Sequence, residues 1–212
     1  MLRKILLIAL AAPLFADDFS FTGNFTSDDN AAYFVFPLES SSSVTLRTLG
    51  YAGGVNAVGT TIGRGGFDPI LSLFAGTGPN ALLIGLNNDG TCGDVGQDSV
   101  TSACWDSYLS MPGLVAGTYT VVLTQSDNSP FGPFLGDGFA RTGQGNFTGP
   151  TFLNAPGSFI DAGLSQRTSD YALDILNVRS AAESAVPEPS TLLLLSSGLL
   201  GLAGWRKRCR LP

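Results

Sequence analysis

The sequence has no histidine among its 212 residues. This absence excludes Ser-His-Asp and Cys-His catalytic arrangements, and also zinc sites that depend on imidazole ligands. The glycine-rich stretch at 63–66 lacks the Lys-Ser/Thr ending and the following helix of a phosphate-binding loop, so its glycines indicate a turn. We predict that the protein is not an enzyme. A glycosidase that works through two carboxylates is the alternative that these absences leave open.

Lysine is missing from the whole stretch at 5–205. All 17 acidic residues lie in that stretch, against five of the eleven basic ones, which gives a net charge of −12. Nucleic-acid binding depends on Lys and Arg displacing the counterions of the phosphate backbone, so nucleic acid is not an expected partner. Divalent cations suit such a surface better.

The N-terminus has the features of a secretory signal peptide. Arg3 and Lys4 precede an apolar run at 5–15, and Ala16 offers a small residue at which a signal peptidase could cut. We therefore predict a signal peptide at 1–16 and an exported protein. The alternative is a short buried helix at the start of a cytosolic domain.

The residues at 17–179 have few helix-favouring side chains and are rich in Gly, Ser, Thr, Asn and Phe. This composition, with short alternating segments bounded by turn residues, predicts one all-β domain: an antiparallel β-sandwich or jelly roll of about eight strands. Within it, Tyr119, Val121 and Leu123 should share one face. We expect a long loop at 52–66, and at 126–169 a long insertion or loops with one irregular edge strand. The expected strands are 19–25, 33–38, 44–51, 70–74, 82–86, 108–111, 118–124 and 171–178.

Two of the three cysteines are separated by a short polar segment. A bridge between Cys92 and Cys104 would close a loop of about a dozen residues and stabilise the fold by roughly 3 kcal/mol in the chain-entropy picture. Export to an oxidising compartment favours this disulfide over two reduced thiols. Cys209 lies in the basic tail, where it has no local partner.

Carboxylate and amide side chains gather at or between the ends of expected strands. Calcium takes six to eight oxygen ligands, so these residues offer a calcium site built from Asp68, Asn88, Asp89 and Asp106, with Asp94 and Asp98 nearby. We favour turn chemistry in a solvated loop over this site, because Asp and Asn also form turn hydrogen bonds and no EF-hand spacing is present.

The aromatic residues leave two further alternatives open. Trp105 could stack on a sugar ring, as in carbohydrate-binding modules, or pack over the neighbouring disulfide. The insertion carries six phenylalanines, for which a small satellite core under the loops is favoured over an exposed patch for a partner. They are Phe131, Phe134, Phe139, Phe147, Phe152 and Phe159.

The C-terminus has three parts in a fixed order. After a small polar linker at 180–185 come Val186, Pro187, Glu188, Pro189 and Ser190. An apolar run at 191–205 follows, which as a transmembrane helix would span about 22 Å, against the roughly 30 Å of a hydrocarbon core. The basic cluster at 206–210 favours retention of that end in the cytoplasm.

The motif, span and basic tail at 186–212 together resemble a PEP-CTERM sorting signal. The resemblance implies an exosortase as partner in a Gram-negative bacterium with an exopolysaccharide matrix, and it makes Pro187, Glu188 and Pro189 the processing site of a substrate. The alternative is a chance Pro-Glu-Pro before a plain membrane anchor. More weakly, segments 66–74, 87–90, 106–110 and 116–121 resemble the bacterial pre-peptidase C-terminal type of β-sandwich.

These observations predict a non-enzymatic protein held transiently in the inner membrane and then placed at the cell surface or in the extracellular matrix. The alternatives are a carbohydrate-binding module for exopolysaccharide, or a calcium-dependent adhesin. No cofactor other than calcium is expected.

Overall fold

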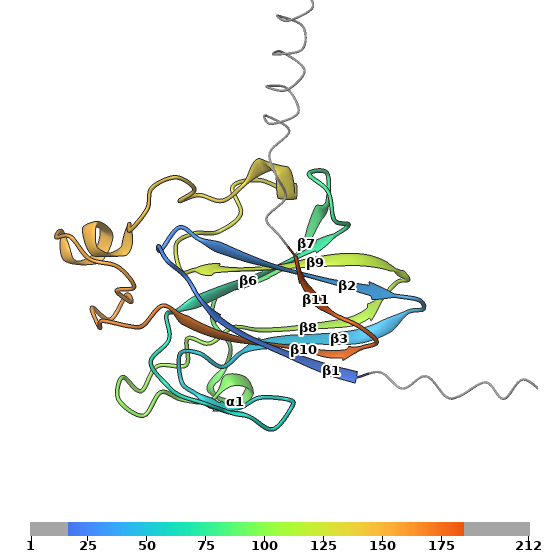
Figure 1. The fold of residues 1–212 in the computed structure, drawn as a ribbon, viewed down its shortest axis with the longest axis horizontal. Helices are drawn as coiled ribbons and strands as arrows, with labels where there is room; N and C mark the ends of the chain where they lie inside the picture. Colours follow the sequence, from blue (N-terminus) through green and yellow to red (C-terminus); the bar gives the residue numbers. More distant parts are fainter. Residues whose placement is uncertain (1–16, 185–212) are drawn as a thin grey trace, which may run out of the picture.

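The structure, a computed structural model, describes residues 17–184. Two antiparallel sheets lie face to face (Figure 1). The first sheet has the strand order β1 (Asp17–Asn24), β10 (Asp170–Val178), β3 (Ser42–Thr48), β8 (Tyr108–Leu114). The second sheet has the order β11 (Ala182–Ser184), β2 (Ala31–Leu38), β9 (Gly117–Gln125), β6 (Pro69–Ala75), β7 (Leu82–Asn87). The predicted antiparallel β-sandwich is confirmed.

The main core lies between the two sheets and follows the alternation of the strands. Tyr119, Val121 and Leu123 of β9 all point into it, as predicted for one face of a strand. Across the core, Leu173 and Ile175 of β10 are fully buried. Burial of side chains of this size stabilises by about 1.5–3 kcal/mol each, so this interface holds the two sheets together.

Each of the eight expected strands is present, and the described residues form eleven strands in all. Two of the additional strands lie in the segment predicted as a long loop, where β4 (Gly54–Val55) and β5 (Thr61–Ile62) make a small antiparallel hairpin. The strand expected at 44–51 ends earlier, at Thr48, because the chain turns there and buries Tyr51 away from the sheet. One helical turn, α1 (Cys92–Val95), precedes β8.

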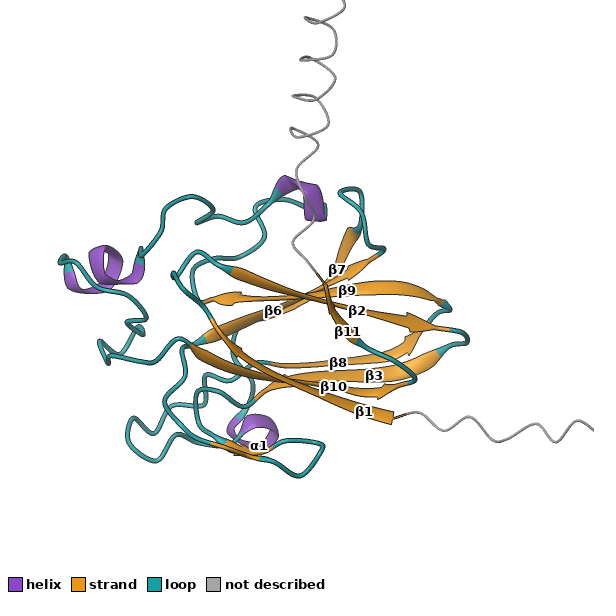
Figure 2. Cartoon of the chain, viewed as in Figure 1, coloured by secondary structure: helices purple, strands orange, loops and turns teal. Residues whose placement is uncertain are grey.

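The insertion at 126–169 contains no strand, so the expected irregular edge strand is wrong. It forms isolated bridges and two short helical turns, η1 (Leu135–Asp137) and η2 (Gly149–Leu153), in place of a continuous ladder (Figure 2). Leu135 and Phe139 cover the outer face of the second sheet. The frequent Gly and Pro residues disfavour a regular strand, and contact with that face orders the segment.

The end of the domain differs from the predicted linker. Ala182–Ser184, part of the segment 180–185, pair with Tyr33, Phe34 and Val35 of β2 as the edge strand β11. The small polar residues here show no alternation of hydrophobic and polar side chains, so no strand was predicted. A strand of three residues can pair with an open edge through its backbone alone. Within residues 17–184 no helix is long and apolar enough to cross a membrane. The predicted signal peptide at 1–16 and membrane span at 191–205 lie outside these residues.

Candidate functional site

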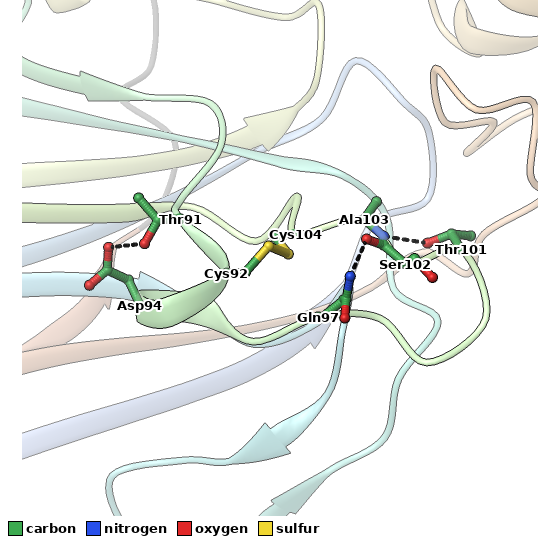
Figure 3. The surroundings of a disulfide bond; sticks show 8 residues. All are labelled: Thr91, Cys92, Asp94, Gln97, Thr101, Ser102, Ala103 and Cys104. Carbon is green, nitrogen blue, oxygen red and sulfur yellow. Dashed lines mark hydrogen bonds between the residues drawn. A yellow bond between two sulfur atoms is a disulfide. The ribbon is translucent and has the colours of Figure 1, made fainter.

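The predicted disulfide is present between Cys92 and Cys104, whose Cα atoms are 5.1 Å apart. Figure 3 shows it closing a loop that has its own hydrogen bonds. Thr91 Oγ1 donates to Asp94 Oδ2 at 2.7 Å, and the Gln97 amide donates to the Ser102 carbonyl at 2.8 Å. The bridge therefore fixes a loop that local bonds alone would hold weakly.

The four residues named for calcium differ in their surroundings, although the charges of Asp89 and Asp106 both act on Asp68. Asp106 is fully buried, and its carboxylate accepts bonds from Thr48 Oγ1 and from the backbone N–H groups of Tyr51 and Ala52. Asn88 and Asp89 are exposed on the loop after β7, whereas Asp68 is buried at the start of β6. Among the residues described, no group of three or more acidic or cysteine side chains is arranged to hold a metal ion. Calcium binding stays a prediction.

Asp68 has an unusual environment for a carboxyl. It is 3% exposed, and its Oδ1 has no hydrogen-bond partner within residues 17–184. Burial, reinforced by the charge of Asp89, raises the pKa of Asp68 well above its usual range. This favours a neutral, protonated carboxyl at that position.

Asp98 holds another part of this loop region together through charge. Its carboxylate accepts bonds from Arg64 Nε at 2.6 Å and from Thr101, and Arg167 lies 3.7 Å away. Burial by itself would raise the pKa of Asp98, but the bonds from Arg64 and Thr101 outweigh it and lower that pKa below its usual range. Arg167 also stacks on Tyr51, 3.6 Å from the ring centroid. Asp98 is therefore a buried structural anchor of this loop, whereas Asp89 and Asp94 are exposed on its surface.

The aromatic residues singled out in the sequence have mixed positions. Trp105 is half-buried and packs against Tyr51 at a centroid distance of 5.4 Å, so it is not a free-standing platform. Phe139 lies in the small second cluster, whereas Phe159 joins the main core. Phe147 is buried and Phe152 half-buried, while Phe131 and Phe134 are exposed. The predicted satellite core is therefore made by only part of the set.

The insertion is anchored on the turn between β1 and β2. Asp28, which is fully buried, accepts bonds from the backbone N–H and hydroxyl of Thr148 and from the backbone N–H of Phe159. Next to it, Asp29 Oδ2 accepts a bond from Gly145 N at 2.9 Å. Sequence analysis missed both residues, because their partners are more than a hundred positions away.

A cavity of about 530 Å³ opens where this turn, β11 and the insertion meet. Asn24 and Asn30 line it from the β1–β2 region, Tyr33 from β2, Phe139 from the insertion, and Glu183 from β11. Opposite Glu183 lies Tyr171, whose hydroxyl donates to the Glu183 carboxylate at 3.5 Å. Burial and the charge of Glu183 raise the pKa of Tyr171 to about 12, which keeps this hydroxyl protonated. The cavity therefore combines aromatic walls with polar side chains.

β11 places the end of the described chain at the rim of this cavity. Its register runs from Ala182 opposite Val35 to Ser184 opposite Tyr33. Beyond Tyr33, only Ala32 and Ala31 of β2 remain before that strand begins. The sorting residues Val186, Pro187, Glu188, Pro189 and Ser190 lie outside the described residues. In the sequence they begin two positions after Ser184, the last residue of β11.

Comparison with known proteins agrees with the motif. The family model of the PEP-CTERM protein-sorting motif matches residues 185–208. The chain therefore carries this sorting motif, as predicted, and the motif indicates an exported, membrane-transiting protein for which an exosortase is the processing partner. The resemblance of the ectodomain to the pre-peptidase C-terminal type is not confirmed.

Two further comparisons add little. No curated protein matches the sequence. Among solved structures, the crystal structure of the Yersinia pseudotuberculosis-derived mitogen is similar, with 9% identity, a TM-score of 0.36, and coverage of 82% of this chain and 93% of the mitogen chain. That score is too low to support an argument about this chain.

Proposed function

We propose that the chain is a non-enzymatic protein of the cell surface or extracellular matrix of a Gram-negative bacterium, processed by an exosortase at Pro187, Glu188 and Pro189. One observation carries the proposal: the match to the sorting motif begins at residue 185, directly after β11 ends at Ser184. A folded cargo domain and its sorting signal thus adjoin, with no further domain between them.

A non-catalytic role is supported by how the buried carboxylates are used. Asp28, Asp98 and Asp106 each accept several bonds from backbone N–H groups, hydroxyls or arginine, which fix loops in place. A glycosidase needs two carboxyl groups facing a shared substrate space. The acidic residues that line the cavity beside the β1–β2 turn are Asp29 and Glu183, and Asp29 is already bonded to Gly145 and Ser27.

The test is the intact mass and location of the protein in its native host, for the wild type and for a variant with Pro187, Glu188 and Pro189 replaced by alanine. We expect the wild type to lose the mass beyond the motif and to leave the inner membrane. The triple variant should keep its full C-terminus and remain in the membrane fraction.

A matched control replaces Ser40 and Ser41, two exposed residues in the turn between β2 and β3, with alanine. This control should be processed like the wild type. Equal mass and equal membrane retention of the wild type and the triple variant would show that the motif is not processed, and would make the chain an ordinary anchored surface protein.

A further inference from the structure

We propose that the cavity bounded by the β1–β2 turn, β11 and the insertion binds one ring of a neutral saccharide. This goes beyond the proposed function and is independent of it, because sorting requires only the C-terminal motif. The volume of about 530 Å³ falls within the roughly 300–1,000 Å³ that is usual for small-molecule sites. Three features of its lining indicate the class of ligand: the aromatic side chains, the hydrogen-bonding groups that the fold leaves without a partner, and the negative charge.

The walls present aromatic rings next to polar groups. Phe25 and Tyr171 pack together at 5.4 Å, and Tyr33 meets Phe139 edge to face at 6.5 Å, so the cavity reaches only the 7–9% of each side chain that stays exposed. All four side chains line the cavity and come from β10, β2, the insertion and the residue that follows β1. A sugar ring has C–H faces that suit aromatic surfaces and hydroxyls at its rim, so it matches a cavity of this mixed kind.

Several polar groups of the lining have hydrogen-bonding capacity that the fold does not use. Tyr33 is 9% exposed and lines the cavity, and its hydroxyl makes no hydrogen bond to any residue in 17–184, so this hydroxyl is open to a ligand. Asn30 uses its carbonyl oxygen three times, for Thr26 N, Thr26 Oγ1 and Ser27 N, which fixes the amide and leaves its NH₂ group as a donor. The Asn24 side chain is exposed and likewise has no partner among the described residues.

The charge of the cavity selects against acidic ligands. Its described lining contains Asp29 and Glu183 and no arginine or lysine. Carboxylates accept bonds from hydroxyls but repel uronates, sulfates and phosphates, so the ligand must be uncharged or carry an amino group. Two acidic residues also fall short of the oxygen ligands that calcium needs, in agreement with the absence of a metal-holding group within 17–184. A neutral sugar matches the aromatic lining, the free hydrogen-bonding groups and the negative charge of the cavity together.

The site also depends on the tertiary arrangement, since no single segment forms it. Asp29 joins the turn to the insertion through Gly145, and Glu183 joins β11 to Tyr171 of the first sheet. A Cβ at Gly23 would lie 2.4 Å from the Tyr171 hydroxyl oxygen, so a larger residue there would displace the Tyr171 side chain. These contacts fix the cavity before a ligand arrives, which lowers the entropy lost on binding.

The experiment is saturation-transfer NMR and isothermal titration of the full chain purified in detergent. The probes are the methyl β-glycosides of glucose, galactose and N-acetylglucosamine, with methyl glucuronide as the acidic comparison and calcium chloride alone as the metal. We expect at least one neutral glycoside to bind with a roughly millimolar Kd and the glucuronide to bind at least about fivefold more weakly.

Two variants locate the site without threatening the fold. Tyr33→Phe removes only the unpartnered hydroxyl, and Asn24→Ala shortens an exposed side chain; each should raise the Kd about fivefold, as expected for one lost hydrogen bond. Tyr108→Phe is the matched control, because Tyr108 lies in β8 outside the cavity and also makes no side-chain hydrogen bond within 17–184. The inference is overturned if no neutral glycoside binds, if only calcium binds, or if both variants bind like the control. Processing at the sorting motif should be unaffected by either variant.

Discussion

Replacement of Asp28 by asparagine tests whether the long insertion is held to the sandwich by one buried carboxylate. Asp28 accepts three hydrogen bonds, from Thr148 N at 2.8 Å, the Thr148 hydroxyl at 2.5 Å and Phe159 N at 2.7 Å, with both carboxylate oxygens in use. An amide has one acceptor oxygen, so Asp28→Asn turns an NH₂ group towards at least one of these donors. The shape of the side chain is otherwise unchanged.

The size of the effect follows from the kind of bond lost. A hydrogen bond to a charged group contributes about 1.5–3 kcal/mol, so we expect Asp28→Asn to lower the free energy of unfolding by about 3 kcal/mol. For a domain of this length that corresponds to a fall in Tm of about 6–12 °C. Urea unfolding followed by circular dichroism gives the free energy of unfolding. Limited proteolysis shows whether cleavage concentrates at 126–169.

The control for this experiment is Asp127→Asn, a residue of the same insertion that lies two positions after the end of β9. Asp127 is exposed and forms a 3.5 Å ion pair with Arg141, a contact expected to contribute less than about 1 kcal/mol. The claim that the Asp28 carboxylate anchors the insertion would be refuted by either of two results. One is a fall of less than about 1 kcal/mol in the free energy of unfolding of Asp28→Asn, and the other is equal protease sensitivity of the two variants.

Two other predictions concern stability. Replacement of Cys92 and Cys104 by serine should lower the free energy of unfolding by roughly 3 kcal/mol, and dithiothreitol should reproduce that loss in the wild type; an unchanged urea midpoint in both cases would contradict it. Asp68→Asn should stabilise the protein near pH 8. A carboxyl whose pKa is raised by folding favours the folded state fully only below its unfolded pKa, about 3.9, and that contribution is lost as pH rises towards the folded value. The difference in Tm between Asp68→Asn and wild type should therefore shrink as pH falls from 8 to 4, and a growing difference would rule out this account.

Sequence patterns predicted the parts of the fold that depend on local alternation. The strand that carries Tyr119, Val121 and Leu123 was recognisable because hydrophobic side chains repeat every second residue there. The disulfide was predictable from spacing and from the export signal, and the sorting motif from its order of parts. Each of these features is encoded within a few neighbouring residues.

The remaining features depend on partners distant in sequence. Asp28 bonds to residues 120 and 131 positions away, so no local pattern marks it as an anchor. Nor does any local pattern show that the Asp106 carboxylate accepts bonds from the backbone N–H groups of Tyr51 and Ala52, more than fifty positions earlier in the chain. The insertion shows no hydrophobic periodicity in its sequence, because buried hydrogen bonds and a few aromatic contacts order it. It has no repeating β-ladder that would require such a pattern.

β11 also bears on how the protein would behave when many copies are crowded together. An open strand edge is a template on which another chain can add, and it is a common origin of sheet-to-sheet aggregation. By pairing with Tyr33, Phe34 and Val35, β11 covers the middle of the β2 edge with a short strand that contains Glu183. Because β11 precedes the motif, a chain cut at Pro187, Glu188 and Pro189 would keep this cover. Removal of the sorting signal would then leave a domain in which the middle of that edge is already covered against self-association.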